Sequence, residues 1–304
     1  MIKYRTARAA FTAAAFAATS MAAGGTAAAD TAPGGCAPAS AAWQTSARES
    51  SYKHGPFILD ANEWNPAGGN GAPESSMTTW AGNDSSWGVC TNQPGTGWPY
   101  PEERLMTGAT PMSSLASIVS GYDETTPSGG MWDSAYDIWL QRPDGAPGQS
   151  PPEVMIWTAN HGEWTGNPTV VGNVTIAGHQ YQMSVCDTCN RVTFVFPSDV
   201  PATTVNLLAV LRYAARHPAS SDITGTDPVV TEIDRGWEIY KTDGEQAFTT
   251  NSYWLNVLRE PLVQRKAAHR KQATHRKPAA HRKSAVHRKP AAHRKPGAHR
   301  KPAR

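Results

Sequence analysis

Apolar and polar side chains alternate along Glu153–Thr158, which predicts a β-strand with two different faces. Val154, Ile156 and Thr158 form a core-like face. Glu153, Met155 and Trp157 share the opposite face. A carboxylate on such a face is costly unless an arginine pairs with it or the face borders solvent or a ligand. By itself the stretch therefore fits a half-buried ion pair as well as it fits a binding cleft.

Further short windows of alternating or apolar residues predict strands, because Gly, Pro, Asn and Asp separate them. These windows lie at 57–64, 77–80, 86–91, 134–140, 170–176, 180–185, 191–196, 229–240 and 246–258. One segment within 204–216 instead has helical spacing, with Val205, Leu208, Leu211 and Ala215 on one stripe of about three turns. Many short strands and a single helix predict an all-β fold, a jelly-roll β-sandwich of two antiparallel sheets.

The start of the chain has the pattern of an export signal. Lys3, Arg5 and Arg8 precede an Ala-rich apolar run, and three alanines at 27–29 offer a cleavage site. We therefore expect a signal peptide over residues 1–29 and a single catalytic-size domain over 30–260. Since no later run is long and apolar enough to cross a bilayer, we expect a secreted, extracellular protein with no membrane span.

The charges divide the chain into an acidic body and a basic tail. Of the 28 Lys and Arg, 15 lie from Arg265 onward and three lie in the leader, which leaves ten against all 25 acids. The body thus carries a balance of −15. Residues 261–304 repeat His-Arg-Lys every six residues, with prolines and no apolar periodicity, and we expect this tail to be disordered.

Four cysteines allow three pairings, and an exported chain permits disulfides. We favour Cys36 with Cys90 and Cys186 with Cys189. The second pair is also a C-x-x-C, which could indicate zinc or redox chemistry. Zinc needs further ligands, and no second pair stands at suitable spacing. Redox pairs sit at the start of a helix, whereas this one lies between strand-like runs, so we favour a structural disulfide.

Three predicted strands place an acid on a face shared with aromatic or small residues. The acids are Asp137, Glu153 and Glu238, and their neighbours are respectively Trp139, Met155 with Trp157, and Gly236 with Tyr240. Aromatic rings pack on the apolar face of a sugar, and carboxylates bind its hydroxyls. The chain also has 11 Trp, more than a core of this size needs, although most Trp in proteins are core residues.

In four motifs the chain resembles the glycoside hydrolase family 12 endoglucanases over about residues 36–258, in the same order and at similar spacing. Asn62–Trp64 is similar to the N-x-W motif near the start, and Tyr136–Trp139 to the strand that places an Asp beside the nucleophile. Glu153–Trp157 is similar to the nucleophile motif E-[LIV]-M-I-W, and Gly236–Tyr240 to the acid/base motif G-x-E-x-aromatic. Cys36, Cys90 and the helix after Val200 also agree.

The resemblance implies two stacked sheets with an open substrate cleft, and retaining endo-hydrolysis of β-1,4-glucosidic bonds in cellulose-type glucans. Glu153 would be the nucleophile and Glu238 the acid/base, with carboxyls about 5–5.5 Å apart. Asp137 would share a hydrogen bond or a proton with Glu153. The substrate-binding residues that it implies are Asn62, Trp64, Met155, Trp157 and Trp139. Neither a cofactor nor a metal is required.

Two other functions stay open. Xyloglucan or mixed-linkage β-glucan could be the substrate, because that choice depends on loops around the cleft. A non-catalytic carbohydrate-binding jelly roll would need the aromatic residues but not two facing carboxylates. Weaker candidates for the acid roles are the acids at 163, 232, 234 and 245. We expect a monomer.

The basic tail has several interpretations. It could be a dispensable solvated extension, dock on the acidic body, hold a metal loosely through its histidines, or adhere to polyanions such as acidic cell-wall polymers. Nucleic acid would be bound by the same physics, but an exported enzyme gives no reason to expect it.

Overall fold

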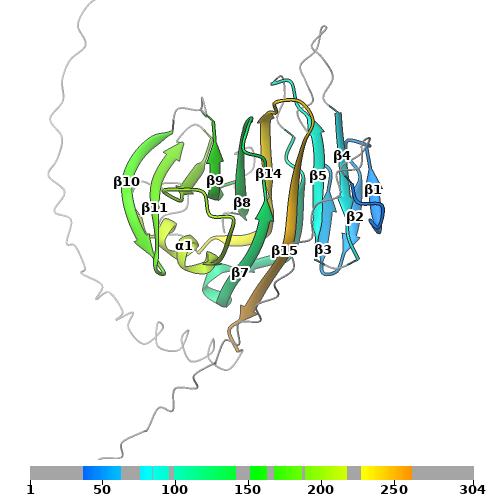
Figure 1. Cartoon of the computed structure of the whole chain (residues 1–304). Coiled ribbons are helices and arrows are strands. Elements are labelled where there is room, and N and C mark those ends of the chain that lie inside the picture. The colour runs from blue at the N-terminus through cyan, green and yellow to red at the C-terminus, as the bar shows by residue number, and fades with distance from the viewer. Residues whose placement is uncertain are drawn as a thin grey trace, which may run out of the picture.

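The computed structural model describes residues 37–62, 76–83, 85–95, 99–141, 151–162, 168–186, 189–217 and 227–261. These residues form two β-sheets and one α-helix, as Figure 1 shows. In the part of the chain that is described, no helix is long and apolar enough to span a bilayer.

The smaller sheet has six strands, all paired antiparallel. Their order across the sheet is β1 (Trp43–Thr45), β4 (Ser76–Ala81), β5 (Trp87–Asn92), β15 (Gln246–Arg259), β7 (Leu115–Thr125) and β13 (Ala202–Asn206). β15 and β7 are its longest strands and lie side by side, so the last described strand of the chain is central.

The larger sheet has nine strands. Their order is β10 (Thr169–Ile176), β11 (His179–Cys186), β12 (Arg191–Val195), β9 (Glu153–His161), β8 (Met131–Gln141), β14 (Val229–Lys241), β6 (Glu102–Pro111), β3 (Phe57–Asp60) and β2 (Ser51–His54). The predicted all-β jelly-roll sandwich is confirmed, with one refinement. β12 pairs with β9 in parallel, because the β10–β12 meander returns the chain beside β9 in the same direction.

The core lies between the sheets in two apolar clusters. The largest fully buried side chains include Trp87, Trp132 and Trp237, and the rings of Trp87 and Trp237 are 4.6 Å apart. These three tryptophans are thus core residues, as expected for most of the tryptophans. Their burial removes the large apolar surfaces of both sheets from water, which is the main driving force for stacking them.

The helix is shorter than the predicted stripe. α1 spans Leu207–Ala214, and the Asn206 side chain caps it by accepting a hydrogen bond from the Ala209 N–H at 3.0 Å. Val205, which the helical stripe included, lies instead on β13 and points into the core. A buried strand residue directly before a capped helix continues the apolar spacing, so the sequence pattern alone does not reveal the boundary.

Two long strands, β6 and β7, were not predicted. Their inward positions carry Glu103 on β6 and Ser120 and Glu124 on β7, each of which is almost fully buried. Because buried polar residues replace apolar ones, the alternation that marks a half-buried strand is lost. The strands exist because the polar groups find partners inside the sandwich.

The predicted disulfide between Cys186 and Cys189 is present, with Cα atoms 5.4 Å apart. Cys90 is also disulfide-bonded, but its predicted partner Cys36 lies outside the described residues. The same holds for the signal peptide, for Trp64 and for the basic tail beyond residue 261. The described residues therefore do not test those predictions.

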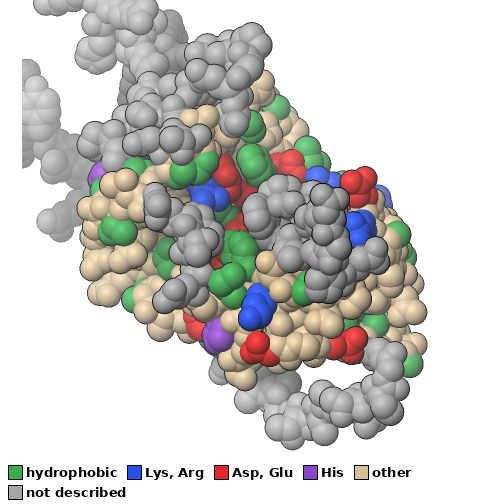
Figure 2. Space-filling model, turned by 90° about the horizontal axis from the view of Figure 1, so that it is seen from above, with side chains coloured by type: hydrophobic (Ala, Val, Ile, Leu, Met, Phe, Trp, Pro, Cys, Tyr) green, Lys and Arg blue, Asp and Glu red, His purple; other side chains and the backbone are tan. Residues whose placement is uncertain are grey.

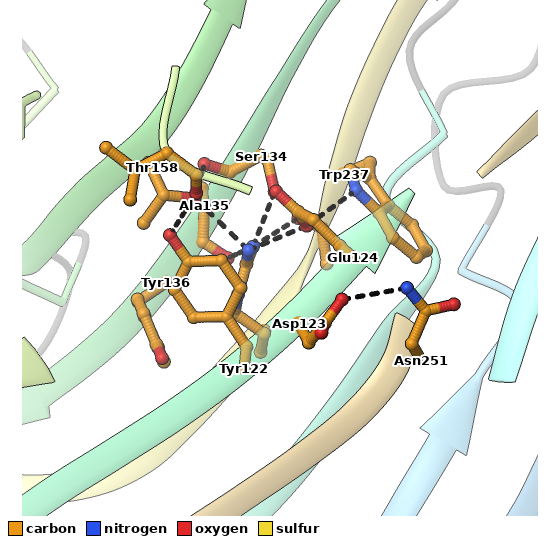
Figure 3. Close-up of polar contacts among 12 residues, drawn as sticks. Tyr122, Asp123, Glu124, Ser134, Ala135, Tyr136, Thr158, Trp237 and Asn251 are labelled. Atoms are coloured by element: carbon orange, nitrogen blue, oxygen red, sulfur yellow. Dashed lines mark hydrogen bonds and ion pairs between the residues drawn. The ribbon is translucent and has the colours of Figure 1, made fainter. Parts of the chain in front are cut away.

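A buried ion pair joins the two sheets beneath β8 and β14. Arg235 of β14 donates to Glu124 Oε2 of β7 at 2.8 Å, and its guanidinium lies 4.2 Å from the ring centre of Tyr122. Figure 3 shows the neighbours around this pair: Ser134 donates to both Glu124 oxygens, and the Trp237 indole donates to Oε2 at 3.2 Å. Both charges are therefore held by several hydrogen bonds, as buried charges require.

Removing one member of this pair should destabilise the sandwich strongly. Arg235→Gln leaves the Glu124 carboxyl in the core without its guanidinium, and we expect the free energy of unfolding to fall by about 3–5 kcal/mol. Urea denaturation followed by tryptophan fluorescence measures this loss.

Two further variants make the test specific. Arg259 is exposed and donates to Thr107 and Thr110, so Arg259→Gln should cost about 1 kcal/mol or less. The double variant Arg235→Met, Glu124→Leu removes both charges and should be more stable than Arg235→Gln. Equal instability of the double and single variants would argue against an ion-pair clamp.

Candidate active site

Strand register brings the predicted acids to one face of the nine-stranded sheet. Asp137 of β8 lies opposite Met155 of β9 on one side and Asp234 of β14 on the other. Glu153 begins β9 beside Trp139, and Glu238 lies opposite Asp133. The face turned away from the core therefore carries acids on three adjacent strands. A space-filling view shows acidic and hydrophobic side chains together in a hollow of the surface (Figure 2).

Several neighbouring groups determine the pKa of Glu153. Burial raises its pKa to about 7, while the positive charge of Arg191, directly opposite on β12, opposes this rise. The negative charge of Glu238 raises it further, and a side-chain hydrogen bond with Asp137 lowers it. The charge of Glu238 is thus close enough to act on Glu153. Near neutral pH, Glu153 exists in both its ionised and its protonated form.

Asp137 is buried between these strands. Burial raises its pKa well above the usual value, and the charges of Glu153, Asp234 and Glu238 raise it further. The raised pKa favours the protonated form of Asp137, which can donate its hydrogen bond to the Glu153 carboxylate. The predicted proximity of Asp137 and Glu153 is present in the structure.

Glu238 has partners that the sequence did not indicate. The Tyr240 hydroxyl lies 2.7 Å from Glu238 Oε2 and 3.0 Å from Asp133 Oδ2. Asp133 is 1% exposed, and burial raises its pKa well above the usual value, as does the charge of Glu238. Two carboxyls and a phenol thus share one small polar pocket at the end of the acid row.

The apolar residues of the predicted site form its floor. Met155 and Trp157 are 1% and 3% exposed and pack with Ala135 and Val195. They therefore expose little surface in this structure, and their role in substrate binding stays a prediction. Trp139 is partly exposed on β8 beside Glu153, and its indole hydrogen-bonds Asp234.

Asn62 contacts an acid of β6. Its backbone has φ of 34°, a left-handed conformation that Asn adopts more readily than most residues. Its side chain donates to Glu102 Oε1 at 3.2 Å, so the structure places it against β6 and not against Glu153. Its motif partner Trp64 lies outside the described residues.

A second group of acids lies beside Asp137, toward β6. Oxygens of Glu102, Glu232 and Asp234 lie within 4.8 Å of one another, so these three residues could hold a cation. Arg104 already supplies positive charge there, pairing with Glu232 at 3.2 Å and with Asp60. Burial raises the pKa of Glu102 to about 8, and the Arg104 charge opposes this rise. Glu102 therefore holds a proton near neutral pH.

Gly236 allows the segment before β6 to pass close to β14. A Cβ at this position would lie 2.1 Å from the Pro101 carbonyl oxygen. The close approach lets Ile239 donate to the Pro99 carbonyl at 3.0 Å. Tyr100, between these prolines, is 5% exposed, and the charges of Asp137 and Glu238 contribute to raising its pKa. The glycine of the G-x-E motif thus brings a phenol into the acid row.

The sequence pattern contained some of these residues. Asp133 lies four residues before Asp137 on the same strand face, and Tyr240 two residues after Glu238. Extending the period of two in both directions would have found them. Glu102 and Arg104 had no such signal, because β6 itself was not predicted.

Taken together, the site is a jelly-roll sheet face with two partly exposed glutamates, Glu153 and Glu238, on separate strands. One glutamate is held beside a cation and a protonated aspartic acid, the other beside a phenol and a buried carboxyl. Different surroundings for two nearby carboxyls favour one ionised and one protonated group, which is the arrangement for acid-assisted nucleophilic substitution.

Known structures have the same fold. The xyloglucanase domain of NopAA from Sinorhizobium fredii, in complex with cellobiose, matches with a TM-score of 0.57 and 22% identity, covering 71% of this chain and 99% of that one. A family 12 xyloglucanase from Bacillus licheniformis matches with a TM-score of 0.59 and 18% identity, covering 71% and 100%. Endoglucanase cel12A from Rhodothermus marinus matches with a TM-score of 0.60 and 15% identity, covering 72% and 100%.

At the level of sequence the similarity is shorter. The chain is 32% identical over 72 residues to the probable cellulase Cel12b of Mycobacterium tuberculosis, a match that covers 24% of this chain and 48% of that protein. The aligned part thus spans about half of that relative's length. No protein-family model matches the chain. The structures define the fold as that of family 12 glycoside hydrolases.

The buried acids should make stability depend on pH. Glu102 binds its proton more tightly in the folded chain, with a pKa of about 8, than in the unfolded chain, where 4.5 applies. Its contribution to stability is therefore fully present below about pH 4.5 and is lost as pH rises through about 8. We expect the Tm to fall over this range, and Glu102→Gln to reduce the slope by up to about 1.4 kcal/mol per pH unit.

Differential scanning calorimetry at a series of pH values measures this effect. Glu245 is an exposed glutamate, so Glu245→Gln should keep the wild-type slope. An unchanged slope in Glu102→Gln would show that this carboxyl is not protonated in the fold.

Proposed function

We propose that the protein is a retaining endo-β-1,4-glucanase of the family 12 type, acting on cellulose-type glucans. The observation that carries the proposal is that Glu153 and Glu238 come from β9 and β14 to one sheet face, where the charge of Glu238 raises the pKa of Glu153. The fold shared with family 12 structures supports it.

In the first step, Glu153 attacks the anomeric carbon while Glu238 gives its proton to the glycosidic oxygen. The bond from the carbon to that oxygen breaks, and a covalent glycosyl–enzyme ester forms on Glu153. In the second step, Glu238 takes a proton from water, whose oxygen bonds to the anomeric carbon and releases Glu153. Two inversions leave the configuration retained.

Asp137 and Arg191 support Glu153 in this scheme. The Asp137 hydrogen bond and the Arg191 charge both favour the ionised form, which is the nucleophile. Burial raises the pKa of Glu153 and so opposes both effects, which keeps the carboxylate basic enough to react. Burial, together with the charges of Glu153, Asp234, Glu238 and Glu102, favours the protonated form of Asp137.

The substrate within the β-glucan class is a finer question. The structural relatives include xyloglucanases as well as endoglucanases, and one xyloglucanase domain is described in complex with cellobiose. A non-catalytic sugar-binding jelly roll is less well supported. Such a protein needs an exposed aromatic platform, whereas Met155 and Trp157 are buried and the acids are not needed for binding.

The two glutamates should be essential for hydrolysis. We expect wild-type protein to release reducing sugar from carboxymethylcellulose, barley β-glucan or xyloglucan. Glu153→Gln and Glu238→Gln should each lose activity by about 10³-fold or more on the preferred substrate, since each removes a group that takes part in bond breaking. The glucan that is cleaved fastest identifies the specificity.

Glu245→Gln is the matched control, because this glutamate is exposed and lies in the turn between β14 and β15. NMR of early products adds a stereochemical check, and the β-anomer must appear first. Near-wild-type turnover by either glutamine variant, or an α-anomer as first product, would rule out this mechanism.

We further propose that the protein is exported and that the basic tail adheres to polyanions, such as acidic cell-wall polymers. The leader pattern supports export. The tail's 15 Lys and Arg, next to an acidic body, support electrostatic attachment to polyanions.

Truncation after Gln264 should abolish salt-sensitive retention on anionic cell-wall preparations and leave kcat on a soluble glucan unchanged. Binding of the full chain should fall steeply from low to high salt, because the charges are screened. A full-length variant with Gln at every Lys and Arg of the repeats is the control for tail length. Retention that survives truncation at both salt concentrations would contradict tail-mediated adhesion.

A further inference from the structure

We propose that Asp133 and Tyr240 are positioning residues for Glu238, forming a proton-sharing unit that sets the pH range in which Glu238 can act as both acid and base. This inference rests on the proposed function, in which Glu238 donates and then accepts a proton. It concerns two residues that the reaction scheme above does not use.

The strand pairing makes the contact unavoidable. Asp133 and Glu238 are direct partners on the adjacent antiparallel strands β8 and β14, so their side chains leave the sheet side by side. Tyr240 follows two residues later on the same face as Glu238, and its hydroxyl lies between the two carboxyls at 3.0 Å and 2.7 Å.

The hydrogen bonds require an extra proton. A side-chain hydrogen bond also links Asp133 to Glu238, and two carboxyls can make one only if one of them is protonated. The phenol has a single proton to donate, so its oxygen must accept from a protonated carboxyl if it is to bond both. Burial and the Glu238 charge raise the pKa of Asp133, so Asp133 is the holder of that proton when Glu238 is ionised.

The arrangement suits both steps of the reaction. After Glu238 has given its proton to the glycosidic oxygen, the Tyr240 hydroxyl donates to the new carboxylate, which keeps Glu238 in place to receive a proton from water. Glu238 regains from water the proton that it gave to the glycosidic oxygen, so atoms and charges balance without another reactant. Before the first step, the close second carboxyl favours a proton on the pair, because two adjacent carboxylates repel each other.

The other charged groups around the pair are unchanged in both variants proposed below. Among the described residues, Glu238 also faces Asp137, Glu153 and Tyr100, and Asp133 feels the positive charge of Arg191. These groups fix the background of the pH profile, whereas Asp133 and Tyr240 are the ones in direct hydrogen-bond contact with Glu238.

The two substitutions have opposite expected effects on the alkaline limb of kcat/KM. Asp133→Asn removes a negative charge and supplies an amide donor to the Glu238 carboxylate, so activity should be lost at a pH about one unit lower. Tyr240→Phe removes a donor to that carboxylate, so the limb should move to higher pH, with kcat about tenfold lower. A change that only loosened the fold would not move the two profiles in opposite directions.

Tyr253→Phe is the control, since Tyr253 also carries a phenol but is buried in the core between the sheets. Its profile should coincide with that of the wild type. Profiles of Asp133→Asn and Tyr240→Phe that coincide with the wild type, or that shift in the same direction, would overturn the inference.

An experiment without turnover separates this inference from the proposed function. In protein labelled with ¹³C at the Asp and Glu carboxyl carbons, the Asp133 and Glu238 signals should each move in two shared steps as pH rises. In Asp133→Asn, the Glu238 signal should move in one step at this site. Independent titration in the wild type would overturn the proton-sharing unit even if the enzyme is active. Coupled titration in a protein inactive on every glucan would instead overturn the proposed function.

Discussion

The ion pair between Arg235 and Glu124 is the interaction on which the arrangement of the site depends. It joins β14 of one sheet to β7 of the other, and Ser134 extends it to β8. Arg235 lies next to Asp234 in the chain, so its side chain enters the core while its neighbour enters the acid row. Fixing the inward residue therefore fixes the outward one, and a polar core network determines the spacing of the acids on the opposite face.

Burial of the acids works against stability and for chemistry. Five acidic groups on the outer face, Glu102, Asp133, Asp137, Glu153 and Asp234, have raised pKa values, with burial as the largest cause. A sheet face selected only for stability would carry apolar or neutral residues there. Crowding makes each proton depend on its neighbours, so the face behaves as one titrating unit and not as separate residues.

The sequence revealed the parts of the molecule in which apolar and polar positions alternate. β8, β9, β14 and β15 follow that pattern, and with them Asp137, Glu153 and Glu238 could be assigned to one face. β6 and β7 could not be found, because Glu103, Ser120 and Glu124 fill their inward positions. Asn62 could not be placed either, since its contact with Glu102 depends on a strand that the pattern did not reveal. Buried polar residues thus limited the prediction of both the fold and the site.

The position of β14 and β15 in their sheets has a consequence for how the chain folds. These two strands are the last in sequence, yet β14 lies between β8 and β6, and β15 lies between β5 and β7. A nascent chain that ends before Val229 would have a gap in the middle of each sheet. The strands on either side of each gap could pair among themselves, but long-range closure of both sheets would wait for β14 and β15. The order of the strands thus predicts that the two sheets close only once the segment Val229–Arg259 is available.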